Sequence, residues 1–444
     1  MNTILLRTTA LSASHALYRL AYWVGLATFS AACALLILFF VARAAIRPVP
    51  GAWATTVQVG PVPVEIGVAS LIWLGTTPWV AQRLDGHTLS SPAGPVRVGW
   101  EVTTQALTLR CQPCSLHNAS WGAAALRLPV VDVHVHRSGM QLQGTVAAGT
   151  VTATWRGQLT HTSLRLDMDL PPTPVRDGYK LFTDAIPELA TAQIDGTFAL
   201  RATLNLPSRA LTLQPELAGM AVHGLGTDQW ANAQSACSKA LPPRAQKVAL
   251  GPNSLLARAV IAAEDQRFFE HTGYDIVEVT HALRSNNQRD GSRQTIGDTP
   301  RANLRGASTL SQQVAKLLVT GGERAPVRKL RELLYAVEME QTLGKARILG
   351  LYLDNAPWGA TVCGAQAAAH TYFAKRADQL TTDEAVWLAA MLHNPALEAR
   401  RWAATGHINV ERAQWVANGL RTTSSTRTAG CNKRNTAQQC TPPR

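Results

Sequence analysis

The chain has 444 residues and carries 42 Lys and Arg against 29 Asp and Glu, a formal net charge of +13 at pH 7. This charge favours anionic partners, which are lipid headgroups, pyrophosphate-bearing substrates or nucleic acid. Cysteine use is modest, with seven residues in the whole chain, and does not indicate a fold held together by disulfides.

The first predicted element is an uncharged, apolar run over residues 22–42. A helix that crosses a bilayer needs about 20 apolar residues, and this run is longer than the roughly 7 to 15 residues of a signal-peptide core. We therefore expect a cytoplasmic N-terminal tail over 1–21 and an uncleaved transmembrane helix over 22–42. A cleaved signal peptide, indicated by the small residues of Ala42-Arg43-Ala44, is the alternative. Because a membrane-anchored basic protein meets lipid first, we expect no nucleic-acid partner.

Residues 50–237 have few helix signals. Polar and apolar side chains alternate in short runs over 57–59, 96–102, 131–136 and 198–206. Clusters of Gly, Pro and Ser separate these runs, as is typical of short strands joined by turns. We expect a β-rich extracytoplasmic domain here, built as an antiparallel sheet or sandwich.

Two residue pairs in this region are candidates for metal or redox chemistry. His134 and His136 share one strand face, but a zinc site normally needs at least three protein ligands and no third is evident. Cys111 and Cys114 form a C-x-x-C that follows a strand and precedes a polar loop, without the βα context of a thioredoxin-like motif. In an oxidising envelope we expect these cysteines to form a local disulfide.

The segment from Ala263 to Gly273 is the most informative part of the chain. It places Glu264 and Asp265 in an apolar helical run, where a carboxylate is costly unless it is used or paired. If the helix continues, Glu264, Phe268 and His271 fall at i, i+4 and i+7 on one face. This combination indicates the wall of a cleft, and an amphipathic surface helix is the alternative.

Two later segments are also predicted to be helices with polar faces. The first has Ser308 as its expected N-cap, and it presents a hydroxyl, an amide and an ammonium at the same spacing: Thr309, Gln313 and Lys316. The second places Arg328 and Glu332 one turn apart and continues to Glu340. Three helices that each carry such a polar face are more than a solvated protein surface alone would need.

These segments resemble the signature motifs of the peptidoglycan glycosyltransferases, lysozyme-like enzymes that polymerise lipid II. The pattern E-D-x-x-F-x-x-H-x-G-x-D is met by Glu264, Asp265, Phe268, His271, Gly273 and Asp275. The pattern G-x-S-T-x-x-Q-Q-x-x-K is met by Gly306, Ser308, Thr309, Gln312, Gln313 and Lys316. The pattern R-K-x-x-E is met by Arg328, Lys329 and Glu332, followed by Ala336 and Glu340. Blocks over 345–375 and 380–395 extend the resemblance, which covers about residues 247–415.

The chain departs from the family pattern in three places. Leu317 stands where the family has Asn, Gly350 and Asp354 replace the usual Glu and Asn, and the segment over 273–306 is long and rich in Arg. These departures concern efficiency, metal use and acceptor contacts more than the type of reaction.

The resemblance implies a multidomain protein that ends in a mainly α, lysozyme-like glycosyltransferase domain over 245–418. It implies polymerisation of lipid II into β-1,4-linked glycan strands, with inversion and release of polyprenyl pyrophosphate, for cell wall synthesis. The protein is expected to be monofunctional, since the remaining residues are few and lack Ser-x-x-Lys followed by Lys-Thr-Gly. They form a polar tail over 419–444, which we expect to be disordered. Cys431 and Cys440 in this tail are candidates for pairing.

The implied partners are lipid II, lipid-linked glycan, the membrane and other cell-wall synthesis proteins. The implied location is the bacterial inner (cytoplasmic) membrane, with a single pass and the catalytic domain on the periplasmic side. Two alternatives stay open: a lysozyme-like enzyme that cleaves glycan, and a lipid-binding scaffold that kept the fold.

The resemblance and the chemistry together assign roles to residues. A sugar hydroxyl is a poor nucleophile and needs a general base, for which Glu264 among apolar neighbours is the candidate. The leaving pyrophosphate needs cations, which Lys316, Arg328 and Lys329 can supply. Glu332, the second candidate catalytic residue, orients these cations or holds a divalent ion, Mg or Mn. No organic cofactor is expected.

The candidate substrate-binding residues are Asp265, Phe268, His271, Thr309, Gln313, Lys316, Arg328 and Lys329. Structural roles compete with several of these assignments: Asp265 as a capping carboxylate, His271 as a satisfied structural imidazole, and Thr309 and Gln313 as packing residues. Glu340 is expected to be an outward salt-bridge partner.

Overall fold

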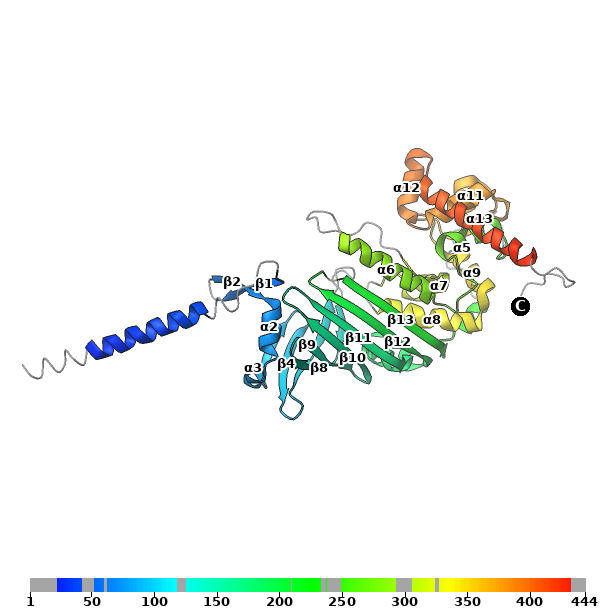
Figure 1. Ribbon diagram of the computed structural model, residues 1–444. Coiled ribbons are helices and arrows are strands. Elements are labelled where there is room, and N and C mark those ends of the chain that lie inside the picture. Colours follow the sequence, from blue (N-terminus) through cyan, green and yellow to red (C-terminus); the bar gives the residue numbers. More distant parts are fainter. Residues whose placement is uncertain are drawn as a thin grey trace, which may run out of the picture.

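The structure is a computed structural model that describes residues 22–41, 52–59, 62–117, 125–208, 210–232, 237, 249–292, 306–323 and 327–432. An apolar N-terminal helix is followed by an antiparallel sheet region and then by a mainly helical region (Figure 1). This order confirms the predicted fold class. The expected cytoplasmic tail over 1–21 lies outside the described residues.

The N-terminal helix spans Tyr22–Val41, 20 residues that are long and apolar enough to cross a membrane. The apolar stretch of this helix is not buried against the rest of the described protein. Its length and composition fit either a membrane anchor or a signal sequence.

The sheet region is built on one nine-stranded antiparallel sheet of order β13-β12-β11-β10-β9-β8-β5-β4-β3. The strands are β3 (Thr88–Ser91), β4 (Gly94–Glu101), β5 (Ala106–Cys111), β8 (Val131–Ser138), β9 (Gln141–Ala148), β10 (Val151–Leu159), β11 (Leu164–Pro174), β12 (Gln193–Leu206) and β13 (Ala210–His223). Successive strands are mostly neighbours, so short turns connect most of them. The runs over 96–102, 131–136 and 198–206 therefore lie in a single sheet rather than a sandwich, and the run over 57–59 lies in β1 of a separate hairpin.

Short elements surround this sheet. Two hairpins pair β1 (Ala54–Val59) with β2 (Val62–Gly67) and β6 (Cys114–His117) with β7 (Ala125–Leu128). Cys111 and Cys114 form the predicted local disulfide. Helices α2 (Val68–Gly75) and α3 (Pro78–Leu84) pack on one sheet face through the buried side chains of Ala69 and Ala81.

The helical region is organised around α5. Its helices are α5 (Leu255–Glu264), α6 (Ile276–Ser292), α7 (Leu310–Ala315), α8 (Arg328–Thr342), α9 (Gly344–Asn355), α10 (Ala365–Phe373), α11 (Thr382–Met391), α12 (Pro395–Thr405) and α13 (Val410–Asn432). Ser254 caps the start of α5, and α11 and α13 pack against it. The small side chains of Ala257, Ala259 and Ala262 are fully buried there, which lets neighbouring helices approach closely.

The expectation of a disordered tail from residue 419 is wrong for its first part, because α13 continues to Asn432. Val416 and Leu420 lie buried in the core. They fix the first turns of the helix, and extending an existing helix costs far less than starting one. Residues 433–444, including Cys440, lie outside the described part of the chain.

The sheet region and the helical region share a continuous core. Ile194 and Val222 from the sheet pack in one cluster with Leu334 and Val337 of α8. The short helix α4 (Val175–Lys180) adds Tyr179, whose hydroxyl donates to the carbonyl of Leu330 at 2.9 Å. One face of α8 is therefore buried against the sheet region.

Polar contacts and a disulfide reinforce this junction. The guanidinium of Arg331 donates to both carboxylate oxygens of Glu188, at 2.6 and 2.9 Å, and the two side chains are only 13% and 5% exposed. Glu338 accepts backbone N–H groups of Leu225 and Thr227 from the chain that follows β13. Cys237 and Cys363 form a second disulfide, which the sequence did not predict.

We predict that Arg331→Met lowers the free energy of unfolding by about 3–5 kcal/mol, because it leaves the buried Glu188 carboxylate without its cation. Thermal and denaturant melts of the full chain would measure the loss. Arg165→Met, which breaks the exposed pair with Asp167, is the control and should lower the free energy of unfolding far less, because solvent screens exposed ion pairs. Equal effects of the two substitutions would contradict a structural role for the buried pair.

Candidate active site

The candidate site forms where α5 ends. The apolar sequence of α5 carries Glu264 into the protein as its last residue, and the Glu264 side chain is only 14% exposed. Its Oε2 accepts a hydrogen bond from Gln313 Nε2 at 3.1 Å. Its Oε1 is buried without a hydrogen-bond partner among the described residues, and Arg412 Nη2 lies 3.7 Å away.

Burial raises the pKa of Glu264 above its ordinary value of 4.5, and the nearby charge of Asp265 adds to this rise. The hydrogen bond from Gln313 and the charge of Arg412 oppose it, so the burial effect dominates. A carboxylate in this environment binds a proton more readily than one in water. Oε2 is held in place by Gln313, and Oε1, which accepts no hydrogen bond from the described residues, can accept a proton.

Gln313 belongs to a chain of hydrogen bonds that fixes its orientation. The hydroxyl of Tyr352 on α9 donates to Gln313 Oε1 at 3.3 Å, so the Gln313 amide N–H points toward Glu264. Burial and the neighbouring Glu264 charge raise the pKa of Tyr352, which keeps it a phenol that can donate. Sequence reasoning did not select Tyr352, although it lies within the fourth block of the family resemblance.

The prediction that one helix face carries Glu264, Phe268 and His271 is wrong, because α5 ends at Glu264. Asp265 follows with an extended backbone at φ −160°, and the chain then turns away. Phe268 is fully buried in the core, with the ammonium of Lys345 4.5 Å from its ring centroid. The helix ends because Asp265 makes tertiary contacts that a helical position would not allow.

Asp265 joins three parts of the site. Its carboxylate accepts from His271 Nε2 at 3.0 Å and from the backbone N–H of Leu310, the first residue of α7, at 2.9 Å. His271 Nδ1 accepts the backbone N–H of Gly273 at 3.2 Å, which leaves Nε2 as the donor to Asp265. Both side chains are buried and their polar groups are occupied, so their contacts position the site. Substrate contact by Asp265 and His271 stays a prediction.

Gly273 is required by its surroundings. Its φ is +98°, and a Cβ there would lie 2.8 Å from the backbone carbonyl of Ala336 on α8. Thr309 Oγ1 donates to the Gly273 carbonyl at 2.8 Å and also accepts the N–H of Gln312. The glycine therefore lets the His271 loop pass directly between α7 and α8.

Thr309, not the predicted Ser308, is the N-cap of α7, and it forms a capping box with Gln312. After Ala315 the chain continues as a π-helix over Lys316–Thr320, so Lys316 leaves the regular face that the sequence predicted. The ammonium of Lys316 is exposed and has no ion-pair partner within the described residues. It is a cation without a structural role in the described part of the chain.

The remaining predicted cations gather around Glu332. The Glu332 side chain is fully buried, and its Oε1 lies 3.1 Å from Arg328 Nε and 3.3 Å from Thr320 Oγ1. Its Oε2 accepts from Lys329 Nζ, which also donates to Ser308 Oγ at 2.9 Å. Glu332 thus holds both cations in place, as one of its two predicted roles requires.

The second predicted role of Glu332, holding a divalent ion, does not fit these contacts. Both carboxylate oxygens are already bound to cationic or hydroxyl donors. Among the described residues no three His, Cys, Asp or Glu side chains are grouped as metal ligands.

Two other findings differ from the sequence prediction. Glu340 is not an outward salt-bridge partner: its side chain is 7% exposed, pairs with Lys345 at 2.8 Å and accepts from Ser311. Arg412 was not predicted, because it lies in α13 beyond the recognised motifs and only the tertiary fold brings it to Glu264. Its Nη2 also donates to the carbonyl of Ala263 at 2.8 Å. Residues 293–305 of the Arg-rich segment before Gly306 lie outside the described residues.

Part of this chain is similar to known proteins. Residues 245–421 match the family model described as Transglycosylase. A biosynthetic peptidoglycan transglycosylase of Stutzerimonas stutzeri is 42% identical over 169 residues, which are 37% of this chain and 63% of the relative. Proteins of the same description from Pseudomonas aeruginosa and Escherichia coli O81 are 41% and 42% identical, over 65% and 60% of their lengths. The chain thus spans less than two thirds of these relatives.

We predict that Glu264→Gln is thermally more stable than the parent above pH 6. Because the folded-state pKa is raised, the ionised carboxylate costs folding free energy, and this cost grows as pH rises through and above 4.5. Thermal melts from pH 4 to pH 8 should therefore show an advantage of the variant that increases with pH.

Glu270→Gln controls for the loss of one negative charge, because the Glu270 side chain is 64% exposed. If Glu264→Gln gave no advantage over this control at any pH, the carboxylate would not be desolvated as described.

Proposed function

We propose that this chain, in which residues 245–421 form a transglycosylase domain, is a membrane-anchored peptidoglycan glycosyltransferase. Its reaction is the polymerisation of lipid II into β-1,4-linked glycan strands. The observation that carries the proposal is the buried Glu264 carboxylate. One of its oxygens has no hydrogen-bond partner among the described residues. The cations Lys316, Arg328 and Lys329 lie directly after α7 and at the start of α8, the helix against which α7 packs.

The proposed base is Glu264. Its Oε1 takes the proton from the acceptor sugar hydroxyl as the hydroxyl oxygen attacks the anomeric carbon of the donor chain. Gln313, which Tyr352 holds in place, donates to the opposite carboxylate oxygen, so the base keeps its orientation. The charge of Arg412 lowers the pKa of Glu264 against the larger effect of burial, and so favours the ionised form, which is the form that accepts a proton.

The proposed leaving group is the polyprenyl pyrophosphate of the donor. As the bond between the anomeric carbon and the pyrophosphate oxygen breaks, negative charge grows on that oxygen and needs cations already in place. Glu332 holds Arg328 and Lys329 in place. Lys316, at the start of the π-helix that precedes α8, is exposed. One displacement inverts the anomeric centre, and no covalent intermediate with the enzyme forms.

The proposed location is the bacterial inner membrane, with a single pass and the sheet and helical regions on the periplasmic side. The N-terminal helix is long and apolar enough for the anchor. The disulfides Cys111–Cys114 and Cys237–Cys363 suit an oxidising compartment. The proposed substrates are lipid II and the lipid-linked glycan strand.

The direct test supplies the purified full chain with labelled lipid II and, in a separate reaction, with preformed glycan. We expect long glycan polymer from lipid II and unchanged preformed glycan. Shortened glycan would instead identify a lysozyme-like cleaving enzyme. Binding of lipid II without polymer would identify a scaffold.

We predict that Glu264→Gln lowers the rate of polymerisation by about 10²- to 10⁴-fold, the range expected when a general base is lost. Binding of lipid II should change little, because the amide keeps the shape of the side chain. Glu270→Gln is the matched control and should polymerise at the parental rate. Undiminished polymerisation by Glu264→Gln would assign the base to another residue.

We predict that Lys316→Met lowers the rate by roughly 10²-fold, comparable to the loss of one preorganised donor to a developing anion. The melting temperature should stay within experimental error of the parent, since Lys316 is exposed and makes no ion pair among the described residues. Lys180→Met, which removes an exposed lysine in the sheet region, serves as the control. A parental rate for Lys316→Met would remove this residue from pyrophosphate stabilisation.

A further inference from the structure

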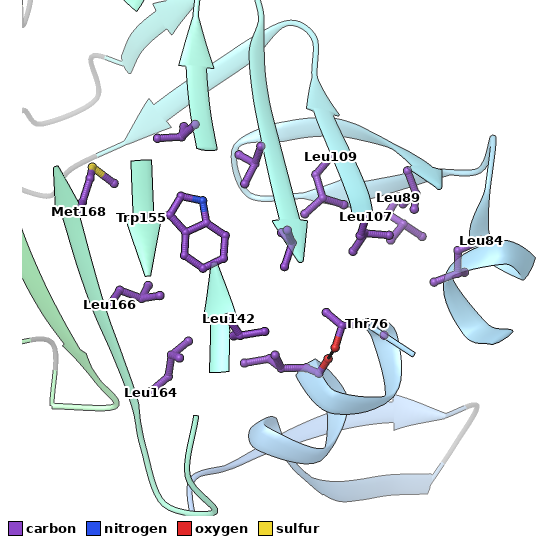
Figure 2. A pocket seen from close by; sticks show the side chains of 16 residues that line it. Thr76, Leu84, Leu89, Leu107, Leu109, Leu142, Trp155, Leu164, Leu166 and Met168 are labelled. Carbon is purple, nitrogen blue, oxygen red and sulfur yellow. Dashed lines mark hydrogen bonds between the residues drawn. The ribbon is translucent and has the colours of Figure 1, made fainter. Parts of the chain in front are cut away.

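The sheet has an apolar face that its covering helices leave partly open. Side chains at alternate positions of neighbouring strands point to this face, as the period of two in a strand requires. Between α2 and α3 they enclose a pocket of about 500 Å³. Figure 2 shows leucines from several strands converging on it around the indole of Trp155. Its lining is apolar apart from Thr76 and the Trp155 indole, and includes Leu107, Leu109, Val133, Leu142, Leu166 and Met168.

The two short helices explain why the pocket stays open. Ala69 of α2 packs against Leu142 and Leu164, while Ala81 of α3 packs against Val98 and Leu107. Each helix covers one part of the sheet face, and the pocket lies between these two clusters. A volume of this size falls within the range of about 300–1,000 Å³ that small-molecule ligands occupy.

The covering helices carry apolar side chains that face solvent. Leu71, Trp73 and Leu74 of α2 are 39%, 48% and 43% exposed, and Trp79 of α3 is 68% exposed. In membrane proteins, tryptophan is enriched at the interface between membrane and water. The N-terminal helix ends at Val41, and Trp53 already packs against the sheet core. A linker of this length spans at most about 40 Å, which keeps the pocket near the proposed membrane surface.

Cations accompany these tryptophans. The guanidinium of Arg137 lies 5.3 Å from the ring of Trp73 and donates to Thr76, which lines the pocket. The guanidinium of Arg83 lies 5.3 Å from the ring of Trp79. An apolar pocket with guanidinium groups beside it matches a molecule that has a hydrocarbon chain and an anionic phosphate headgroup.

We propose that this pocket binds one acyl chain of a membrane phospholipid, with its headgroup phosphate beside Arg137. The polyprenyl chain of the glycosyltransferase substrate is a poorer match, because its pyrophosphate has to reach the cations of α8. Arg137 lies on β8, five strand positions from β13, which packs on α8. At about 4.8 Å per strand this separation is roughly 24 Å.

The test measures lipid that remains with the full chain after purification in a non-ionic detergent, by lipid extraction and mass spectrometry. Val133→Trp fills the pocket from β8 with an apolar side chain. His134→Trp puts the same ring on the opposite face of the same strand, where the side chain is exposed. We expect the parent and His134→Trp to retain equal phospholipid, and Val133→Trp to retain less by about one phospholipid per protein molecule, the amount that one occupied pocket holds. The smaller Val133→Phe should give an intermediate value and serves as the pocket variant if Val133→Trp does not fold.

Three results would overturn the proposal. These are equal phospholipid in the parent and the folded pocket variant, equal loss in His134→Trp, and retention of a polyprenyl phosphate in place of phospholipid. Lipid around the N-terminal helix is common to all variants, so it cancels in the comparison. The readout is bound lipid rather than glycan polymer, so its outcome is separate from that of the glycosyltransferase assay.

Discussion

Helix α8 is the element on which both halves of the protein depend. Arg331, Leu334 and Val337 face the sheet region, where Arg331 meets the buried Glu188 carboxylate. Arg328, Lys329 and Glu332 occupy other positions of the same helix and form the cation cluster. A rigid helix cannot move one face without moving the other. The sheet region therefore fixes the position of groups that we assign to the pyrophosphate, although it contributes no residue to the cluster.

The candidate site combines two different electrostatic environments. Around Glu264, among the residues that the structure describes, one buried carboxylate oxygen has no hydrogen bond, and Gln313 and the more distant Arg412 stabilise its charge. Around Glu332, all the stabilising groups are present, with two cations and a hydroxyl on one buried carboxylate. The first environment suits a group that exchanges a proton, and the second suits a group that stays ionised to hold its neighbours.

The sequence predicted the order of the regions and most members of the site, because strand alternation and motif spacing are local signals. It could not predict that α5 ends at Glu264, since the cause is the contact of Asp265 with His271 and Leu310 across the fold. Arg412 was missed for the same reason, as its neighbours in sequence give no sign of Glu264. Whether the strands form one sheet or a sandwich likewise depends on long-range strand pairing. The alternation of side chains along one strand does not predict which strands pair.

The disulfide joins Cys237 to Cys363, which are 126 residues apart in the sequence, and so closes a covalent ring. Glu264, Lys316, Glu332 and Tyr352 all lie inside this ring. In the chain-entropy model, a disulfide that closes a loop of this length stabilises the folded protein by on the order of 4–5 kcal/mol, because it lowers the entropy of the unfolded chain. Because the cytosol keeps thiols reduced, the periplasmic location proposed above would let the bond form only after the chain has crossed the membrane. Maturation would then have a direction: the site would acquire its full stability on the far side of the bilayer, and a chain retained in the cytosol would remain an immature form.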